Sequence, residues 1–339
     1  RTFAEKELYP YEDEVESSDE VRPELAQQIR DRAIEQGFYA ANMPEELGGG
    51  GLDSVSLSLV ERELGRANFA LQYLVGRPSN ILQACVGEQR ERYLFPCIRG
   101  EKTDCLAMTE PGAGSDLRSM QCRAKRDGDD YIINGTKHFI SHADIADFVI
   151  LFAATGEEAS SRGPRKLISS FLVDKRTSGF TVRRGYHSVS HRGYHNCILE
   201  FENCRVPASQ MLGAEHQGFN VANDWLGATR LQVAAMCLGR AYRALEHATD
   251  WAAERKQFGQ FIGRFQGIGF KLAEMKMQLE ATELLTLKAA WKTDHGTATD
   301  TDYAMAKLHA TEMLAFVADE AIQIHGGMGL MSDLPLERI

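Results

Sequence analysis

The stretch Ala107–Asp116, AMTEPGAGSD, lies where the residue pattern of the chain changes. An apolar run stops at Thr109, and a turn with one proline and two glycines, Gly112 and Gly114, leads into Ser115. One interpretation is an ordinary surface turn whose glycines supply positive φ angles. The other is a turn whose bare backbone N–H groups and hydroxyls approach a ligand closely, above all a phosphate. The segment matches neither the dinucleotide fingerprint nor the P-loop, because their third glycine and their lysine are missing.

The chain before this segment has the periodicity of helices. Leu25, Ile29, Ala33 and Ile34 fall on one apolar stripe, and Gly37 is a suitable residue to end that helix. A second stripe follows after a glycine-rich loop, and its members are Leu57, Val60 and Leu64. The first hundred residues therefore predict a helical region.

The chain after this segment changes to short β-rich runs separated by turn residues. Asn134-Gly135 in the first run is a strong signal for a hairpin turn. The pattern predicts a small β domain, whose candidate strands lie within residues 131–141, 147–155, 167–175, 179–184 and 197–207.

A helical period returns after Gly213 and continues to the end of the sequence. Residues 230–259, 265–291 and 302–327 each carry a broad apolar face, and short connections between such helices are typical of an antiparallel bundle. The fold class is therefore α+β and multidomain. We expect an N-terminal α-helical domain over 1–104, a middle antiparallel β domain over 105–213 and a C-terminal four-helix-bundle-like domain over 214–339.

Composition excludes several classes of function. The formal net charge of -10 argues against a nucleic-acid partner, because binding phosphate backbones needs a basic surface. No apolar run is long enough to span a bilayer, which predicts no membrane partner. The seven cysteines include no C-x-x-C pair and so suggest neither a zinc site nor a disulfide framework. Scattered thiols of this kind fit a reducing compartment.

Six segments, in order and spread over nearly the whole chain, resemble the acyl-CoA dehydrogenase family. They are MPEELGGGGLD, AMTEPGAGSDL, YIINGTKHFIS, FENCRVPASQMLG, ERKQFGQFIGRFQGIGFKLAEM and QIHGGMGLMSDLPLERI. The resemblance implies an FAD-dependent flavoenzyme with an α–β–α layout that desaturates an acyl-CoA thioester. It also implies a homotetramer or homodimer, with the flavin at the subunit interface, and electron-transferring flavoprotein as the electron acceptor.

The resemblance assigns roles to the opening segment. Leu106, Met108 and Thr109 would line the isoalloxazine ring of FAD. Gly114 and Ser115 would lie at its pyrophosphate, and Ser115 would also touch the thioester substrate. The ligand interpretation of the turn is thereby favoured over the plain surface turn.

A second flavin segment follows where the family carries Trp-(Ile/Met)-Thr. This chain has Phe139, Ile140 and Ser141 at those positions. Phe139 would stack on the ring, and the Ser141 hydroxyl would donate a hydrogen bond to flavin N5. The alternative is that Phe139 is an ordinary hydrophobic strand residue.

Two late segments complete the cofactor site in the family, across a subunit interface. Arg255 is the candidate partner of the adenine-side phosphates, although taken singly it could be a solvated helix charge. The other cofactor candidates by resemblance are Gln257, Phe258, Gln266, Gln323, Ile324, His325, Gly326 and Gly327. If the resemblance holds, no monomer has a complete flavin site.

The catalytic base is missing from both places where the family carries it. Most relatives place a glutamate in a loop that would follow Ile339, and a minority place it on a helix where this chain has Thr229. Threonine cannot remove an α-proton, so we expect the base after Ile339, and the alternative is that dehydrogenation has been lost. Arg230 matches an arginine beside the active site, or it is a surface helix charge.

The sequence indicates the acyl group of the substrate less clearly than it indicates the cofactor. Leu226, Arg230 and Ser115 are substrate-side candidates by resemblance, and Gln72, Tyr73, Gly76 and Arg77 lie where relatives line the acyl pocket. These polar residues favour a short or medium, branched or polar thioester over a long alkyl chain, unless Arg77 is simply solvated. Alternatives are an enoyl-CoA reductase of the crotonobetainyl-CoA reductase type and a non-catalytic FAD-binding relative. A bacterial cytoplasm is favoured over the mitochondrial matrix.

A metal site is the remaining alternative. His187, His191 and His195 are spaced by four and could share one face of an element. Gly185 and Gly193 interrupt the segment, however, and no carboxylate is spaced with the histidines. We therefore expect no metal.

Overall fold

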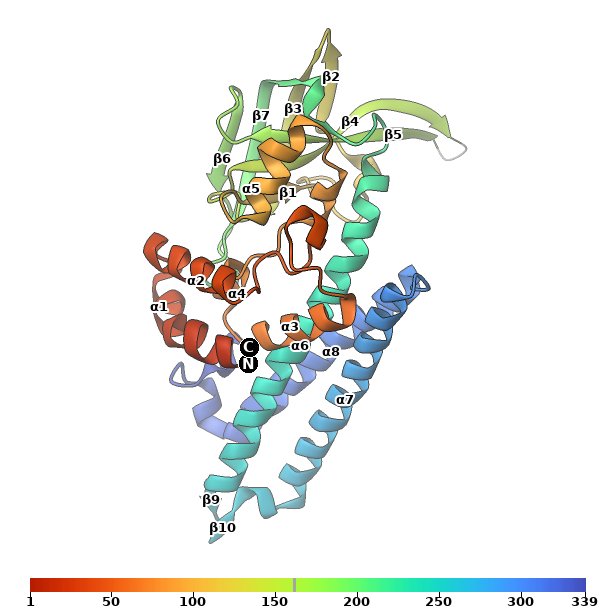
Figure 1. The fold of residues 1–339 in the computed structure, drawn as a ribbon. Helices are drawn as coiled ribbons and strands as arrows, with labels where there is room; N and C mark the ends of the chain where they lie inside the picture. The colour runs from red at the N-terminus through yellow and green to blue at the C-terminus, as the bar shows by residue number, and fades with distance from the viewer. Residues whose placement is uncertain (161–162) are drawn as a thin grey trace. The chain divides into compact units, whose positions relative to one another are not determined.

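The computed structural model describes residues 1–160 and 163–339 (Figure 1). They form two compact units, each assembled from separated stretches of chain. One unit comprises Arg1–Ile29, Leu52–Leu74 and Leu226–Ile339, and the other comprises Arg30–Gly51 and Val75–Trp225. No helix among these residues is long and apolar enough to cross a membrane.

The second unit is built on a single eight-stranded sheet. Its strands are β1 (Asp104–Ala107), β2 (Arg123–Asp127), β3 (Asp130–Ser141), β4 (Phe148–Ser160), β5 (Gly163–Asp174), β6 (Phe180–Arg184), β7 (Asn196–Pro207) and β8 (Met211–Leu212). The order is β6-β7-β3-β2-β4-β5-β8, with β1 paired to β4 (Figure 1). The short helix α5 (Phe95–Ile98) belongs to the same unit.

The sheet is mixed, so the expectation of a purely antiparallel domain was wrong. β1 pairs with β4 in parallel, and β2 makes a parallel contact with β4 at Arg123 and Ala154. Parallel pairing needs a long crossover connection. The turn after β1 and the β2–β3 hairpin supply it, because together they return the chain to the edge from which β1 started. The central residues of β4, Val149–Ala153, are fully buried, as expected for a strand covered on both faces.

Asn134-Gly135 does not form the predicted hairpin turn. β3 runs through it, and the chain reverses at Gly128 between β2 and β3 instead. Gly135 lies at a register shift against β7, with φ +148, and a Cβ there would come within 2.6 Å of the Cys122 backbone. Asn134 Oδ1 accepts a hydrogen bond from the Asn203 N–H at 2.8 Å. The dipeptide thus serves a β-bulge, which uses the same turn chemistry as a hairpin.

The first unit is helical. Its elements are α1 (Glu12–Ser18), α3 (Ser54–Leu64), α4 (Phe69–Leu74), α7 (Gln266–Asp294) and α8 (Asp300–His325), and the hairpin strands β9 (Lys256–Gln257) and β10 (Gln260–Phe261). Two helices, α2 (Pro23–Glu35) and α6 (Gly218–Glu254), run across the boundary between the units. The C-terminal part of α6 shares one apolar core with α7 and α8.

The helix α3 packs against α7 and α6. The contact between α3 and α6 is close because Gly65, at the end of α3, lies against the backbone of α6, and Gly239 on α6 lies against the backbone of α3. A Cβ on Gly239 would lie 2.0 Å from the Arg62 carbonyl oxygen, and one on Gly65 would lie 2.6 Å from the Met236 Cα. The prediction of a helical C-terminal part is confirmed, but α3, which packs against it, comes from the N-terminal part of the chain.

The stripe predicted for the first long helix is correct except at one position. Leu25, Ile29 and Ala33 are buried, but Ile34 is 45% exposed. Adjacent helical residues differ by about 100° in direction, so Ala33 and Ile34 cannot both face the same core. The helix ends at Glu35, and Gly37 follows in the left-handed region at φ +73, as predicted for a stop signal.

Candidate functional site

The turn after β1 exposes bare backbone. Glu110 and Ala113 exchange two main-chain hydrogen bonds of 3.0 and 3.1 Å, which close a tight loop at Pro111 and Gly112. Gly112 and Gly114 are exposed, neither has a positive φ, and a Cβ on either would meet nothing within 4 Å. Neither conformation nor protein packing therefore requires glycine here. The backbone at both glycines is therefore open to the close approach of a ligand.

A buried ion pair fixes that turn to the sheet. Lys137 on β3 is fully buried and Glu110 is 3% exposed, and the lysine Nζ lies 2.7 Å from Glu110 Oε1. The same ammonium donates to the Met108 carbonyl oxygen at 3.0 Å. The Glu110 carboxylate also accepts the N–H groups of Gln121 at 2.6 Å and Cys122 at 3.0 Å. One pair thus holds the end of β1, the start of β2 and the middle of β3 together.

Sequence reasoning missed this pair. Burial lowers the pKa of Lys137, and the nearby Glu110 opposes that change by favouring the charged lysine. A lysine inside an apolar strand and a glutamate in the turn were the available signals. Their pairing depends on strand register, which the sequence does not display.

Phe139 lies next to the turn in an unusual backbone conformation. The His138 N–H donates to the Thr109 carbonyl oxygen at 3.1 Å, which brings the end of β1 beside residues 138–141. The register against β7 shifts between Lys137 and Ile140, and Phe139 has φ +57. Positive φ is rare outside glycine and often marks a functional site.

The Phe139 ring is 53% exposed and lies 5.1 Å from the ring of Tyr186. It is therefore not an ordinary core residue of a strand. Ile140, in contrast, is buried, so only its backbone could contact a ligand. The bulge presents a flat aromatic face at the end of β3, on which another ring system could stack.

Ser141 is the last residue of β3 and pairs with Asn196, two residues after Tyr194. Burial raises the pKa of Tyr194 to about 12, so the phenol stays protonated. The ring of His142 lies edge-on to that of Tyr194 with centroids 3.9 Å apart. Burial lowers the pKa of His142 to about 3, so its imidazole is neutral.

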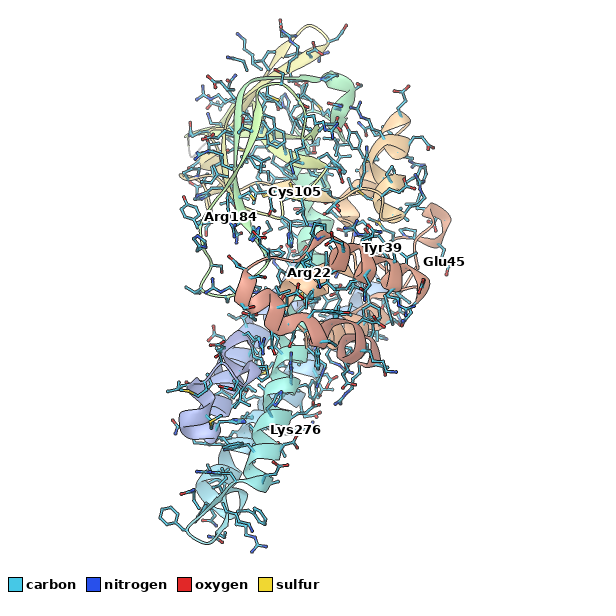
Figure 2. The ribbon with its side chains drawn as sticks, turned by 90° about the vertical axis from the view of Figure 1, so that its left-hand side faces the viewer. Arg22, Tyr39, Glu45, Cys105, Arg184 and Lys276 are labelled. Carbon is cyan, nitrogen blue, oxygen red and sulfur yellow. The ribbon has the colours of Figure 1, made fainter. Side chains whose placement is uncertain are left out.

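Two of the three histidines considered as metal ligands, His191 and His195, make side-chain hydrogen bonds. His195 Nδ1 lies 2.6 Å from Asp144, and its Nε2 lies 3.1 Å from the guanidinium of Arg184, labelled in Figure 2 at the end of β6. His191 Nδ1 lies 2.6 Å from the Ser190 hydroxyl. Within residues 1–160 and 163–339, no three His, Cys, Asp or Glu side chains gather as metal ligands.

The helical unit brings the two late segments together through stacked rings. The Arg255 guanidinium lies 5.9 Å from the Trp251 ring centroid, and Trp251 stacks on His325 at 5.2 Å. Gln257 and Phe258 lie on the β9–β10 hairpin, where Phe258 is almost fully exposed. The remaining candidates are exposed Gln266 at the start of α7, exposed Gln323, buried Ile324, and the glycines Gly326 (φ +62) and Gly327.

The acyl-pocket candidates divide between the two units. Gln72 is buried on α4, and its Nε2 donates to Glu61 at 3.3 Å, while Gln232 on α6 donates to the same carboxylate at 3.2 Å. Gln72 Oε1 is buried and has no hydrogen-bond partner among the described residues. Tyr73 is half-buried on the same helix.

Arg77 is half-buried in the sheet unit, where Gly76 precedes it. Gly76 itself is packed against Tyr39: a Cβ there would lie 1.9 Å from the tyrosine ring. On α6, Leu226 and Thr229 are half-buried, and Arg230 Nη1 lies 3.9 Å from the exposed Asp300.

Three domain models of one family match the chain from end to end. The acyl-CoA dehydrogenase N-terminal, middle and C-terminal domains match residues 1–101, 105–204 and 216–339. The chain is 38% identical to 3-(aryl)acrylate reductase of Clostridium sporogenes over 344 residues, which cover all of this chain and 89% of that protein.

Two further proteins extend the similarity. The CarC subunit of the caffeyl-CoA reductase-Etf complex of Acetobacterium woodii is 36% identical, again with 100% of this chain and 89% of that protein covered. The structure of butyryl-CoA dehydrogenase from Megasphaera elsdenii superposes with a TM-score of 0.89 at 34% identity, covering 99% of this chain and 88% of that one.

Proposed function

Because the chain belongs to the acyl-CoA dehydrogenase family, whose members are FAD-dependent oxidoreductases acting on CH–CH bonds, we propose that it interconverts an acyl-CoA thioester and its 2-enoyl form. The observation that carries this proposal is the junction of the turn after β1 with the bulge at Phe139. It joins open glycine backbone, hydroxyls and an exposed aromatic ring within one unit. That combination suits a cofactor with both a ring system and phosphates.

The residues of this junction fit FAD. Leu106, Met108 and Thr109 would hold one side of its ring system, Phe139 would stack on it, and Gly114 and Ser115 would lie at its pyrophosphate. When bound, FAD would supply the acceptor or donor of a hydride. The Ser141 hydroxyl would donate a hydrogen bond to flavin N5, and the buried Lys137–Glu110 pair keeps the turn in place.

The substrate-side residues follow from family membership. Ser115 contacts the thioester, and Leu226 and Arg230 on α6 contribute to the acyl-CoA site. Thr229 cannot take an α-proton, and the proposed reaction needs a carboxylate that removes this proton on desaturation or returns it on reduction. A relative that binds FAD without such a carboxylate would be non-catalytic.

A reductase is the second candidate, and a specific observation favours it. Two of the similar proteins are reductases by name, 3-(aryl)acrylate reductase and the caffeyl-CoA reductase subunit. The buried carboxylate Glu61, bound by Gln72 and Gln232, adds a polar environment beside the pocket candidates. Gln72 Oε1 could accept a hydrogen bond from a hydroxyl on the acyl tail, which a long alkyl tail would leave unpaired.

Assembly and electron transfer complete the proposal. The protein forms a homotetramer or homodimer in which Arg255, Gln257, Phe258, Gln266 and residues 323–327 serve the flavin of a neighbouring subunit. Electron-transferring flavoprotein is the electron partner, as the name of one relative's complex suggests. Seven unpaired, buried cysteines and bacterial relatives favour a cytoplasmic enzyme of acyl-CoA metabolism.

We expect the purified protein to be yellow and to carry FAD. Ser141→Ala should retain FAD but lower its rate of reduction roughly tenfold, because one hydrogen bond to N5 is lost. The measurements are visible absorbance, FAD content and stopped-flow bleaching. Ser119→Ala, which removes a half-buried hydroxyl that donates to Asp116, is the matched control. A colourless protein that takes up no FAD on reconstitution would contradict the proposed function.

We expect short, polar or aryl acyl-CoA thioesters to bleach the flavin faster than octanoyl-CoA. If Arg77 faces the pocket, an alkyl tail leaves its charge desolvated, and Arg77→Met should shift the ranking toward alkyl tails by roughly tenfold. Stopped-flow bleaching with a panel of thioesters measures the ranking of substrates in the native protein and in Arg77→Met. If octanoyl-CoA bleaches the flavin fastest, the preference for short, polar or aryl thioesters is refuted. If Arg77→Met leaves the ranking of thioesters unchanged, Arg77 does not face the acyl pocket.

A further inference from the structure

Arg240 on α6 is a buried cation without a counter-ion in the part of the chain that the structure describes. The residue is 8% exposed, and it makes no hydrogen bond or ion pair within residues 1–160 and 163–339. Its guanidinium carbon lies 5.7 Å from the centroid of the Phe69 ring, at the start of α4. A guanidinium has five N–H donors and keeps its charge in proteins. Arg240 therefore lacks the partners that a buried charge requires.

Two other buried arginines of the helical unit are paired with carboxylates. Arg243, one turn further along α6, donates to both oxygens of Glu12 at 2.8 Å and to the Arg66 carbonyl oxygen at 2.8 Å. Arg66 forms its own ion pair with Glu246. The Glu12 carboxylate also accepts the Asn68 N–H at 2.7 Å, so both of its oxygens are already engaged. These pairs are neutral, and they leave the charge of the third arginine without compensation.

The charges around Arg240 call for a single negative charge. Burial lowers the pKa of Arg240, Glu12 opposes this change, and the positive charge of Arg243 adds to it. Because Glu12 and Arg243 cancel each other, one positive charge remains at the Arg240 guanidinium. A monovalent anion would neutralise it, whereas a dianion would leave a buried negative charge instead.

A tight contact between helices separates Arg240 from the substrate-side residues of α6. Met236 and Gly239 lie between Gln232 and Arg240 along the helix, and the backbone of α3 lies against both of them. A Cβ on Gly239 would come within 2.0 Å of the Arg62 carbonyl oxygen. An acyl tail running from Gln232 to Arg240 would have to displace this backbone. The occupant is therefore a free ion, and the low exposure of Arg240 favours one of few atoms.

We propose that Arg240 forms a binding site for a small monovalent anion of the chloride class, held between α6 and the start of α4. The anion accepts hydrogen bonds from the guanidinium N–H groups, and the Phe69 ring covers another side of the guanidinium. Both residues lie in the helical unit, and the site does not depend on the proposed function. Because unfolding would release the ion, binding stabilises the folded chain.

The test compares chloride with gluconate, an anion too large for this site, at constant ionic strength. Chloride at about a hundred times its dissociation constant should raise the thermal unfolding midpoint of the native protein by roughly 3–5 °C. Arg240→Met should respond by less than about 1 °C. In gluconate this variant should be at least as stable as the native protein, because it removes an uncompensated buried charge. Arg22→Met is the matched control: it removes an exposed arginine paired with Glu14 and should keep the chloride response.

Equal chloride responses in the native protein and in Arg240→Met would overturn the inference. A loss of stability of Arg240→Met in gluconate would overturn it too, because the guanidinium would then be satisfied by protein or water alone. If Arg240→Met does not fold, native crystals soaked in bromide decide: anomalous scattering at the guanidinium supports the site, and its absence overturns it. Stabilisation by an acyl-CoA with a terminal carboxylate, and not by chloride, would assign Arg240 to the substrate and overturn the free-ion site.

Discussion

Replacing Lys137 by methionine is expected to lower the free energy of unfolding by about 3–5 kcal/mol and to empty the flavin site. Methionine leaves the Glu110 carboxylate buried without its cation, and the Met108 carbonyl oxygen loses its donor. The strained bulge at Phe139 begins two residues further along the strand, so the turn and the aromatic face are both released. Urea unfolding followed by circular dichroism gives the stability, and absorbance gives the FAD content.

A double variant distinguishes the pair from a general packing defect. Lys137→Met with Glu110→Gln removes the uncompensated charge and keeps one amide oxygen for the N–H groups of Gln121 and Cys122. It should recover a large part of the stability lost in Lys137→Met alone. Arg205→Met, which breaks exposed ion pairs with Asp127 and Asp130 in the same sheet unit, should leave the unfolding midpoint nearly unchanged. Equal losses in Arg205→Met and Lys137→Met, or no recovery in the double variant, would contradict this account.

Local periodicity accounts for the parts of the fold that the sequence could predict. Helical stripes and β-rich runs depend on residues close together in the chain, and they identified the helical and strand regions correctly. The prediction that Ile34 is buried was wrong because an apolar residue next to the buried stripe was counted as part of it. The prediction of a hairpin turn at Asn134-Gly135 was wrong because this dipeptide suits both a hairpin turn and a β-bulge, and only the pairing with β7 distinguishes the two.

Long-range pairing accounts for the parts that could not be predicted. The parallel pairing of β1 with β4, the Lys137–Glu110 ion pair and the pairing of Ser141 with Asn196 all join residues whose partners are set by strand register. Arg255 and His325 were named as flavin candidates by resemblance, but their connection through Trp251 required the helical unit to fold. Motif residues could thus be recognised individually, whereas the groups that orient them could not.

The exposed face of α7 carries a stripe of large apolar side chains. Phe270, Met277, Leu284 and Trp291 are 64%, 61%, 68% and 53% exposed, and their numbers differ by seven, so they lie along one line of the helix. On α8, Met305 and Leu308 are also exposed. Apolar side chains scattered singly are ordinary, but four large ones repeated every seven residues along one helix face favour an interaction surface. Under the proposed function, a second copy of this chain covers it.

Met277→Glu combined with Leu284→Glu is therefore expected to convert the oligomer largely to monomer, since two carboxylates would be desolvated at the interface. FAD content should fall with it, because Arg255, Gln266 and Gln323 would no longer reach a neighbour's flavin. Sedimentation velocity and absorbance measure both quantities on one sample. Lys276→Glu is the matched control: it changes the net charge by the same two units on the same helix, at a side chain paired with Glu280 (Figure 2). A double variant that stays oligomeric, or a monomer that keeps its full complement of FAD, would refute the shared flavin site.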